Sequence, residues 1–196
     1  MKAHVLASLI LASLAAGCVP EFTQPLPFKA DRSVDHRLLG HWTAKEDNGD
    51  ENHALFFRRG DGWYDIVFIT GANASAHSNG LDCTIYEGYS AMVGTNWFLS
   101  FRARPQDLQN LVKKPDRNNF MLAEYSVTDK AFVLHLFSED KVRAMIRDGK
   151  LKGTAETTSD LVLVTEGSQG IENALSTNNP SAFWDEDRGL NLQRSP

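Results

Sequence analysis

The side chains in this 196-residue sequence that could do chemistry are not gathered into a recognisable catalytic or metal-binding motif. No two histidines after residue 17 have the His-x-His or His-Glu-x-x-His spacing with which a strand or a helix presents two ligands to a metal. No serine lies in the Gly-x-Ser-x-Gly turn of hydrolases, and Glu87 and Glu124 are single acids within apolar segments. We therefore expect no enzymatic activity, no metal site and no cofactor.

The two cysteines are the remaining reactive groups, and they lie in different contexts. Cys18 follows the basic residue Lys2 and an uncharged apolar run over residues 5–16, which is the order of a secretory signal. A helix over that run would span only about 18 Å, whereas the hydrocarbon core of a bilayer measures about 30 Å. Cys83 lies in a segment of strand-like composition, so we expect a buried and inert thiol.

The sequence Leu14-Ala15-Ala16-Gly17-Cys18 resembles the lipobox of bacterial lipoproteins. The resemblance implies that residues 1–17 are a signal peptide cleaved between Gly17 and Cys18, that the Cys18 sulfur carries a diacylglycerol, and that the new amine is acylated. Two or three acyl chains hold a protein durably on a bilayer. The alternative is an ordinary secretory signal whose cysteine lies near the cleavage point.

The same resemblance implies a location in the cell envelope. In lipoproteins of bacteria with two membranes, Asp after the acylated cysteine directs retention at the inner membrane, and here that residue is Val19. We therefore expect the periplasmic side of the outer membrane if the source has two membranes.

The size and charge of the remaining chain indicate one acidic domain. A chain of this length buries a single core without disulfides or metals. Without Lys2 the formal charge falls from −5 to −6, and basic clusters are nearly absent, so we expect no binding of nucleic acid. Three prolines in residues 18–35 predict a tether, residues 36–185 form the predicted domain, and residues 186–196 are predicted to be a loose tail.

The apolar pattern within the domain predicts mainly β structure. Period-two runs separated by turn residues indicate hairpins, and a meander of eight strands must protect its edges. We expect an antiparallel eight-stranded barrel or strongly curled sheet, with short helices after Ser138 and near Ser168 in the last third of the chain. The predicted strands span residues 38–44, 53–59, 63–70, 83–93, 96–103, 120–127, 131–137 and 161–165.

Gly40-His41-Trp42 begins the first predicted strand, and it resembles the Gly-x-Trp motif of lipocalins and related calycin barrels. The resemblance implies that Trp42 packs across the closed end of a barrel. No later arginine is assigned to a lipocalin motif. The whole layout also resembles that of bacterial envelope lipoproteins of no assigned activity.

Two functions agree with these observations. The first is binding of a small hydrophobic or amphipathic molecule inside the barrel, since a barrel of about eight strands is either filled by side chains or holds one small ligand. The second is a structural or protein-interaction role in the envelope, without a small ligand. The aromatic residues expected to line a ligand site are Trp63, Tyr86, Tyr89, Trp97 and Tyr125.

Overall fold

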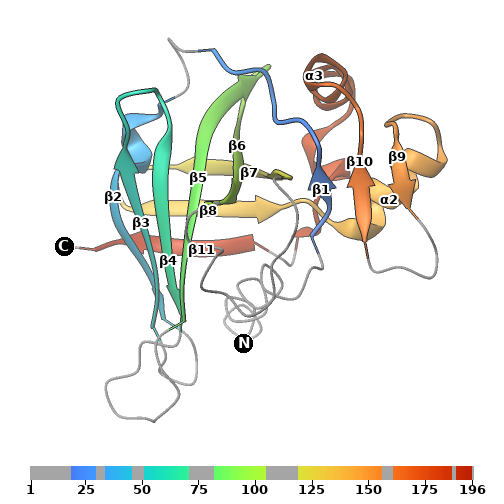
Figure 1. Cartoon of the computed structure of the whole chain (residues 1–196). Coiled ribbons are helices and arrows are strands. Elements are labelled where there is room, and N and C mark those ends of the chain that lie inside the picture. Colours follow the sequence, from blue (N-terminus) through green and yellow to red (C-terminus); the bar gives the residue numbers. More distant parts are fainter. Residues whose placement is uncertain are drawn as a thin grey trace.

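A closed β-barrel with a small second layer on one side forms the domain in the computed structural model (Figure 1). The structure describes residues 19–29, 34–45, 51–70, 82–104, 119–155, 161–186 and 189–195. Gly17 and Cys18 lie outside these ranges, so the predicted lipobox stays a prediction. Neither described helix has the length and apolar character that crossing a bilayer requires.

Eight antiparallel strands close the barrel in the order β11-β2-β3-β4-β5-β6-β7-β8. Consecutive strands from β2 to β8 pair as hairpins, with Gly62 and Gly94 adopting positive φ at two of the turns. The prediction of an eight-stranded antiparallel barrel is therefore confirmed. The strands are β2 (Gly40–Lys45), β3 (Glu51–Arg58), β4 (Tyr64–Thr70), β5 (Asp82–Val93), β6 (Asn96–Ala103), β7 (Met121–Val127), β8 (Ala131–Leu136) and β11 (Gly189–Arg194).

The last barrel strand corrects the prediction for the C-terminus. Residues 186–196 were expected to be loose, but β11 pairs with β8 over five residues and with β2 over two, and this pairing closes the cylinder. Leu190 and Leu192 are 1% and 2% exposed and point into the barrel. Their alternation with polar residues is the pattern of a half-buried strand.

A three-stranded sheet and two helices form the second layer, against the outside of β5, β6 and β7. The sheet has the order β1-β10-β9, with β1 (Glu21–Phe22), β10 (Val162–Val164) and β9 (Gly153–Ala155). The predicted strand at 161–165 therefore exists, but it belongs to this sheet and not to the barrel. Helices α2 (Glu139–Arg147) and α3 (Ser168–Thr177) confirm the two short helices.

The segment before the barrel corrects the prediction of a free tether. Phe22 and Leu26 are fully buried and Val19 is 6% exposed, so residues 19–29 are packed against the domain rather than extended away from it. Asp35 and the 3-10 turn η1 (His36–Leu38) then close one end of the barrel, with Leu38 fully buried.

Candidate functional site

Gly40, Trp42 and Arg194 form one unit at the closed end of the barrel. Trp42 is fully buried, and its indole N–H donates to the Leu38 carbonyl at 2.7 Å. The Arg194 guanidinium lies 4.2 Å from the centre of the Trp42 ring, and Gly40 has a φ of 117° with the guanidinium beside it. The structure therefore places Trp42 at the closed end, as the resemblance implies. It also adds Arg194, which sequence reasoning missed because this residue lay in the predicted tail.

Three of the five aromatic residues expected to line a ligand site lie in or at the barrel. Tyr86 packs edge-on against Phe68 and Phe101, with ring centroids 5.7 and 5.6 Å away. Tyr125 is 3% exposed, and Trp97 lies over it at the rim with 6.2 Å between ring centroids. These rings pack on other buried aromatic side chains and fill the space between the strands.

The other two, Trp63 and Tyr89, lie outside the barrel, so they do not line its interior. Tyr89 is covered by the N-terminal segment, and its hydroxyl donates to the Leu26 carbonyl. Trp63 packs on Tyr89 at 4.9 Å and faces Phe28 at 6.4 Å between ring centroids. This aromatic group attaches the N-terminal segment to the barrel wall.

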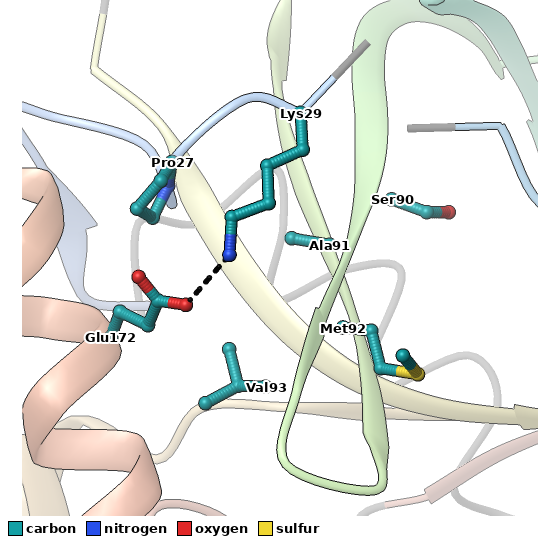
Figure 2. Close-up of a pocket in the computed structure, with 7 residues that line it drawn as sticks. All are labelled: Pro27, Lys29, Ser90, Ala91, Met92, Val93 and Glu172. Atoms are coloured by element: carbon teal, nitrogen blue, oxygen red, sulfur yellow. Dashed lines mark hydrogen bonds and ion pairs between the residues drawn. The ribbon is translucent and has the colours of Figure 1, made fainter. Parts of the chain in front are cut away.

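A small pocket beside that segment measures about 20 Å³. It lies between residues 27–29, the end of β5 and α3, and Figure 2 shows Lys29 and Glu172 joined across its mouth by an ion pair of 3.1 Å. A cavity of this size holds about one water molecule. It is therefore no site for a lipid or another hydrophobic ligand of ordinary size.

A buried polar cluster lies where the turn η1 meets the barrel. The Tyr125 hydroxyl lies 2.8 Å from Ser90 Oγ and 3.2 Å from Asp35 Oδ2, and the Tyr64 hydroxyl lies 3.1 Å from the same Ser90 oxygen. Burial would raise the pKa of Asp35, but hydrogen bonds and charge from Arg37 outweigh it and hold that pKa below its usual value. Arg37 donates to both carboxylate oxygens at 2.9 and 2.7 Å.

The tyrosines of this cluster are poor proton carriers near neutral pH. Burial raises the pKa of Tyr64 to about 12 and that of Tyr125 further above its ordinary value. A general acid or base works best with a pKa near the working pH, and none of these groups has one. The cluster therefore fastens the turn η1 to three strands through satisfied hydrogen bonds.

The structure brings two histidines together that are not close in sequence. His41 on β2 and His53 on β3 point outward, with His41 Nε2 and His53 Nδ1 3.0 Å apart. Within the described ranges, no three His, Cys, Asp or Glu side chains gather in a way that could hold a metal ion. The hairpin register could have indicated this pair, because His53 lies opposite Thr43, two residues from His41.

Cys83 is exposed, which contradicts the expected buried thiol. It is the second residue of β5, and its parity is opposite to that of the inward-facing Tyr86, so the thiol points to the outside of the barrel.

Another partly buried group lies on the outside of β7 and β8. The His135 ring stacks on the Trp184 indole at 3.9 Å, and that indole donates to a Glu124 carboxylate oxygen at 2.5 Å. His135 Nδ1 is buried without a hydrogen-bond partner in the described part of the chain, and burial lowers the pKa of this imidazole. Burial raises the Glu124 pKa, and the bond from Trp184 opposes that rise.

The outer side of β3, β4 and β5 carries the largest exposed apolar side chain of the barrel, Phe57, which is 52% exposed. Leu55 lies opposite Val67, and Val67 lies opposite Ile85, so their side chains form one continuous row across three strands. Phe57 lies in the next row of the same face, directly opposite Asp65 and diagonal to Val67. We define the apolar outer face as Leu55, Phe57, Val67, Ile69 and Ile85; the four aliphatic members are half-buried.

Alternating charges border the apolar outer face on one side. Glu87 accepts from Arg59 at 2.9 Å and from Arg102 at 2.7 Å. Asp65 lies 2.6 Å from Arg104 and 3.8 Å from Arg59. These ion pairs are one-quarter to one-third exposed, apart from the more buried Glu87, and they hold one another in place. An apolar centre with a polar, ordered rim is the composition of a protein-binding surface.

No protein-family model, curated protein or solved structure matches this chain. The barrel is compatible with a lipocalin-like fold through its closed eight-stranded topology and through the packing of Trp42 at its closed end. Of the surfaces and clusters described, the apolar outer face combines exposure, continuity and an ordered charged border.

Proposed function

We propose that this chain is a non-catalytic lipoprotein of the cell envelope that binds another protein through the apolar outer face. Acylation of Cys18 provides the anchor, and the outer membrane is its location if the source has two membranes. The observation that carries the binding role is Phe57, a large apolar side chain half exposed beside an aliphatic row that crosses three paired strands. Exposed apolar patches with a polar rim mark interaction sites on soluble domains.

The energetics of the face agree with binding of moderate strength. Full burial of a phenylalanine side chain contributes about 1.5–3 kcal/mol, so covering the exposed half of Phe57 contributes about 1 kcal/mol. Covering the aliphatic row adds to this. The charges at Asp65, Glu87 and their arginine partners orient an incoming partner more than they strengthen its binding.

The small-ligand function is the alternative, and it stays a prediction. Its support is the barrel itself, which has a size that suits one small molecule. The protein-binding role takes first place here because Tyr86, Phe101 and Tyr125 fill the described part of the interior, whereas the apolar outer face is open. Native mass spectrometry of the purified chain, with a bound small molecule as the positive result, tests the alternative.

Site-specific photo-crosslinking in intact envelopes tests the proposed function. A photoreactive phenylalanine analogue at Phe57 is expected to give one discrete protein adduct. The matched control carries the same analogue at Ser126, an exposed position elsewhere on the barrel wall, and is expected to give none. The Phe57 adduct is expected to disappear when Val67 is replaced by Glu, since that charge lies at the centre of the face. Equal adducts at both positions, or an adduct that survives Val67→Glu, contradict the proposal.

A further inference from the structure

The segment 19–29, which we call the strap, is attached to the domain at several points along its length. Phe22 exchanges two backbone hydrogen bonds of 2.8 Å with Phe120, and β1 pairs with β10. Leu26 donates its backbone N–H to Ser100 Oγ at 3.2 Å and accepts from the Tyr89 hydroxyl. Val19, the residue next to Cys18, is 6% exposed and belongs to the buried cluster that includes the barrel interior.

The strap has a direction relative to the barrel. Phe22 pairs with Phe120, which precedes Met121 in the chain. Met121 pairs with Phe101 of β6, and Phe101 pairs with Gly88 of β5, so Phe22 lies near the middle of β5. Leu26 contacts Tyr89, and residues 27–29 reach the final residues of β5, 90–93. The strap therefore advances toward the carboxyl end of β5, as the blue and green ribbons of Figure 1 show, so the start of the strap is its part farthest from that end.

We infer that the domain is held directly on the bilayer surface in one orientation, with the end of the barrel where β5 begins facing the lipid. This inference rests on the proposed acylation of Cys18. Adjacent Cα atoms are 3.8 Å apart, so the acylated residue is one peptide unit from the packed Val19. A free tether over residues 19–35 would have allowed a separation of about 56 Å and any orientation. The strap removes that freedom, and the partner surface proposed above is then presented at a fixed height beside the membrane.

Two positions at opposite ends of β5 test the orientation. The native thiol of Cys83 is exposed at the start of the strand, and Thr95 is exposed in the turn just after its end. Twelve strand residues separate the two ends by about 40 Å along the strand. A fluorophore is attached either to Cys83 or, in the Cys83→Ser background, to Thr95→Cys. The lipidated proteins are reconstituted in vesicles whose headgroups carry a quencher.

Quenching is expected to be at least about threefold stronger at Cys83 than at Thr95, because the two labels lie about 40 Å apart along the strand and a contact quencher reaches only the label that is near the headgroups. A control protein carries 15 Gly/Ser residues inserted between Cys18 and Val19, which leaves the strap intact and adds slack of about 20 Å. This insertion is expected to reduce the difference to near equality.

Two results overturn the inference, and they are distinguishable. If the protein is acylated and vesicle-bound but both positions are quenched equally, and the inserted linker changes nothing, the domain is not oriented by the strap and the anchor alone survives. If the chain stays in the aqueous phase with an unmodified Cys18, the inference and the proposed anchor fail together.

Discussion

Replacing Arg194 by alanine is expected to destabilise the domain by about 3–4 kcal/mol. The guanidinium donates to three backbone carbonyls, those of Leu39 at 3.0 Å, Arg37 at 2.6 Å and Asp129 at 3.0 Å. Hydrogen bonds from a charged donor contribute about 1.5–3 kcal/mol when buried, and we take about 1 kcal/mol for each because two of the three are exposed. The contact with the Trp42 ring adds about 0.5–1 kcal/mol.

Urea unfolding followed by tryptophan fluorescence measures this loss. With a denaturant dependence of about 2 kcal/mol/M, the midpoint is expected to fall by about 1.5–2 M. Arg194→Lys keeps the charge but cannot donate to all three carbonyls at once, so we expect about half of the loss in unfolding free energy that Arg194→Ala causes. Arg58→Ala, at an exposed position at the end of β3, is the matched control and is expected to change stability by less than about 0.5 kcal/mol. If the unfolding free energy of Arg194→Ala also differs from that of the wild type by less than about 0.5 kcal/mol, the idea that Arg194 fixes the last strand in place is refuted.

Three further predictions concern the titration and reactivity of the folded domain. Burial raises the pKa of Tyr64 and Tyr86 to about 12, and it raises the pKa of the other two tyrosines further. We therefore expect about 10% or less of the tyrosine side chains to be ionised at pH 11 in the folded protein, against about 90% in urea. Absorbance at 295 nm measures the ionised fraction, and a high fraction in a sample that is still folded contradicts the prediction. Burial lowers the pKa of His135 in the folded state below 6.5, so the unfolded chain binds this proton first and stability falls as pH drops below about 6.5. The His135→Phe variant is expected to lose less stability than the wild type between pH 7 and pH 5. An identical loss in both proteins argues against the burial of His135. The exposed Cys83 thiol is expected to react with a thiol reagent in the native protein without prior unfolding, and protection until unfolding contradicts its exposure.

The barrel could be predicted from the sequence because its hairpins are local and its strands alternate. Trp42, Phe56 and Phe132 face inward from strands with period-two patterns, and the turn residues between hairpins are of the types that turns require. The closing strand was missed because residues 189–194 offer only two leucines among polar residues, and their partner β8 lies nearly sixty residues earlier in the chain. Local pattern does not show such a distant pairing.

The strap was missed for a different physical reason. Prolines near Val19 and Leu26 suggested an extended tether, but an extended chain also pairs well with a sheet edge and inserts single apolar side chains into a neighbouring layer. Phe22 and Leu26 were the available signal, since two large apolar residues are unusual in a free linker. The apolar outer face could not be read from the runs around Leu55 and Val67, because apolar residues on both sides of a strand look the same whether one side is covered or open.

The intact mass of the chain recovered from envelope membranes tests the acylated anchor most directly. The expected result is a chain that begins at Cys18 and carries the added mass of a diacylglycerol and an amide-linked acyl chain. A chain that begins elsewhere, or that begins at Cys18 with an unmodified thiol, would contradict the anchor and with it the placement of this barrel on a membrane.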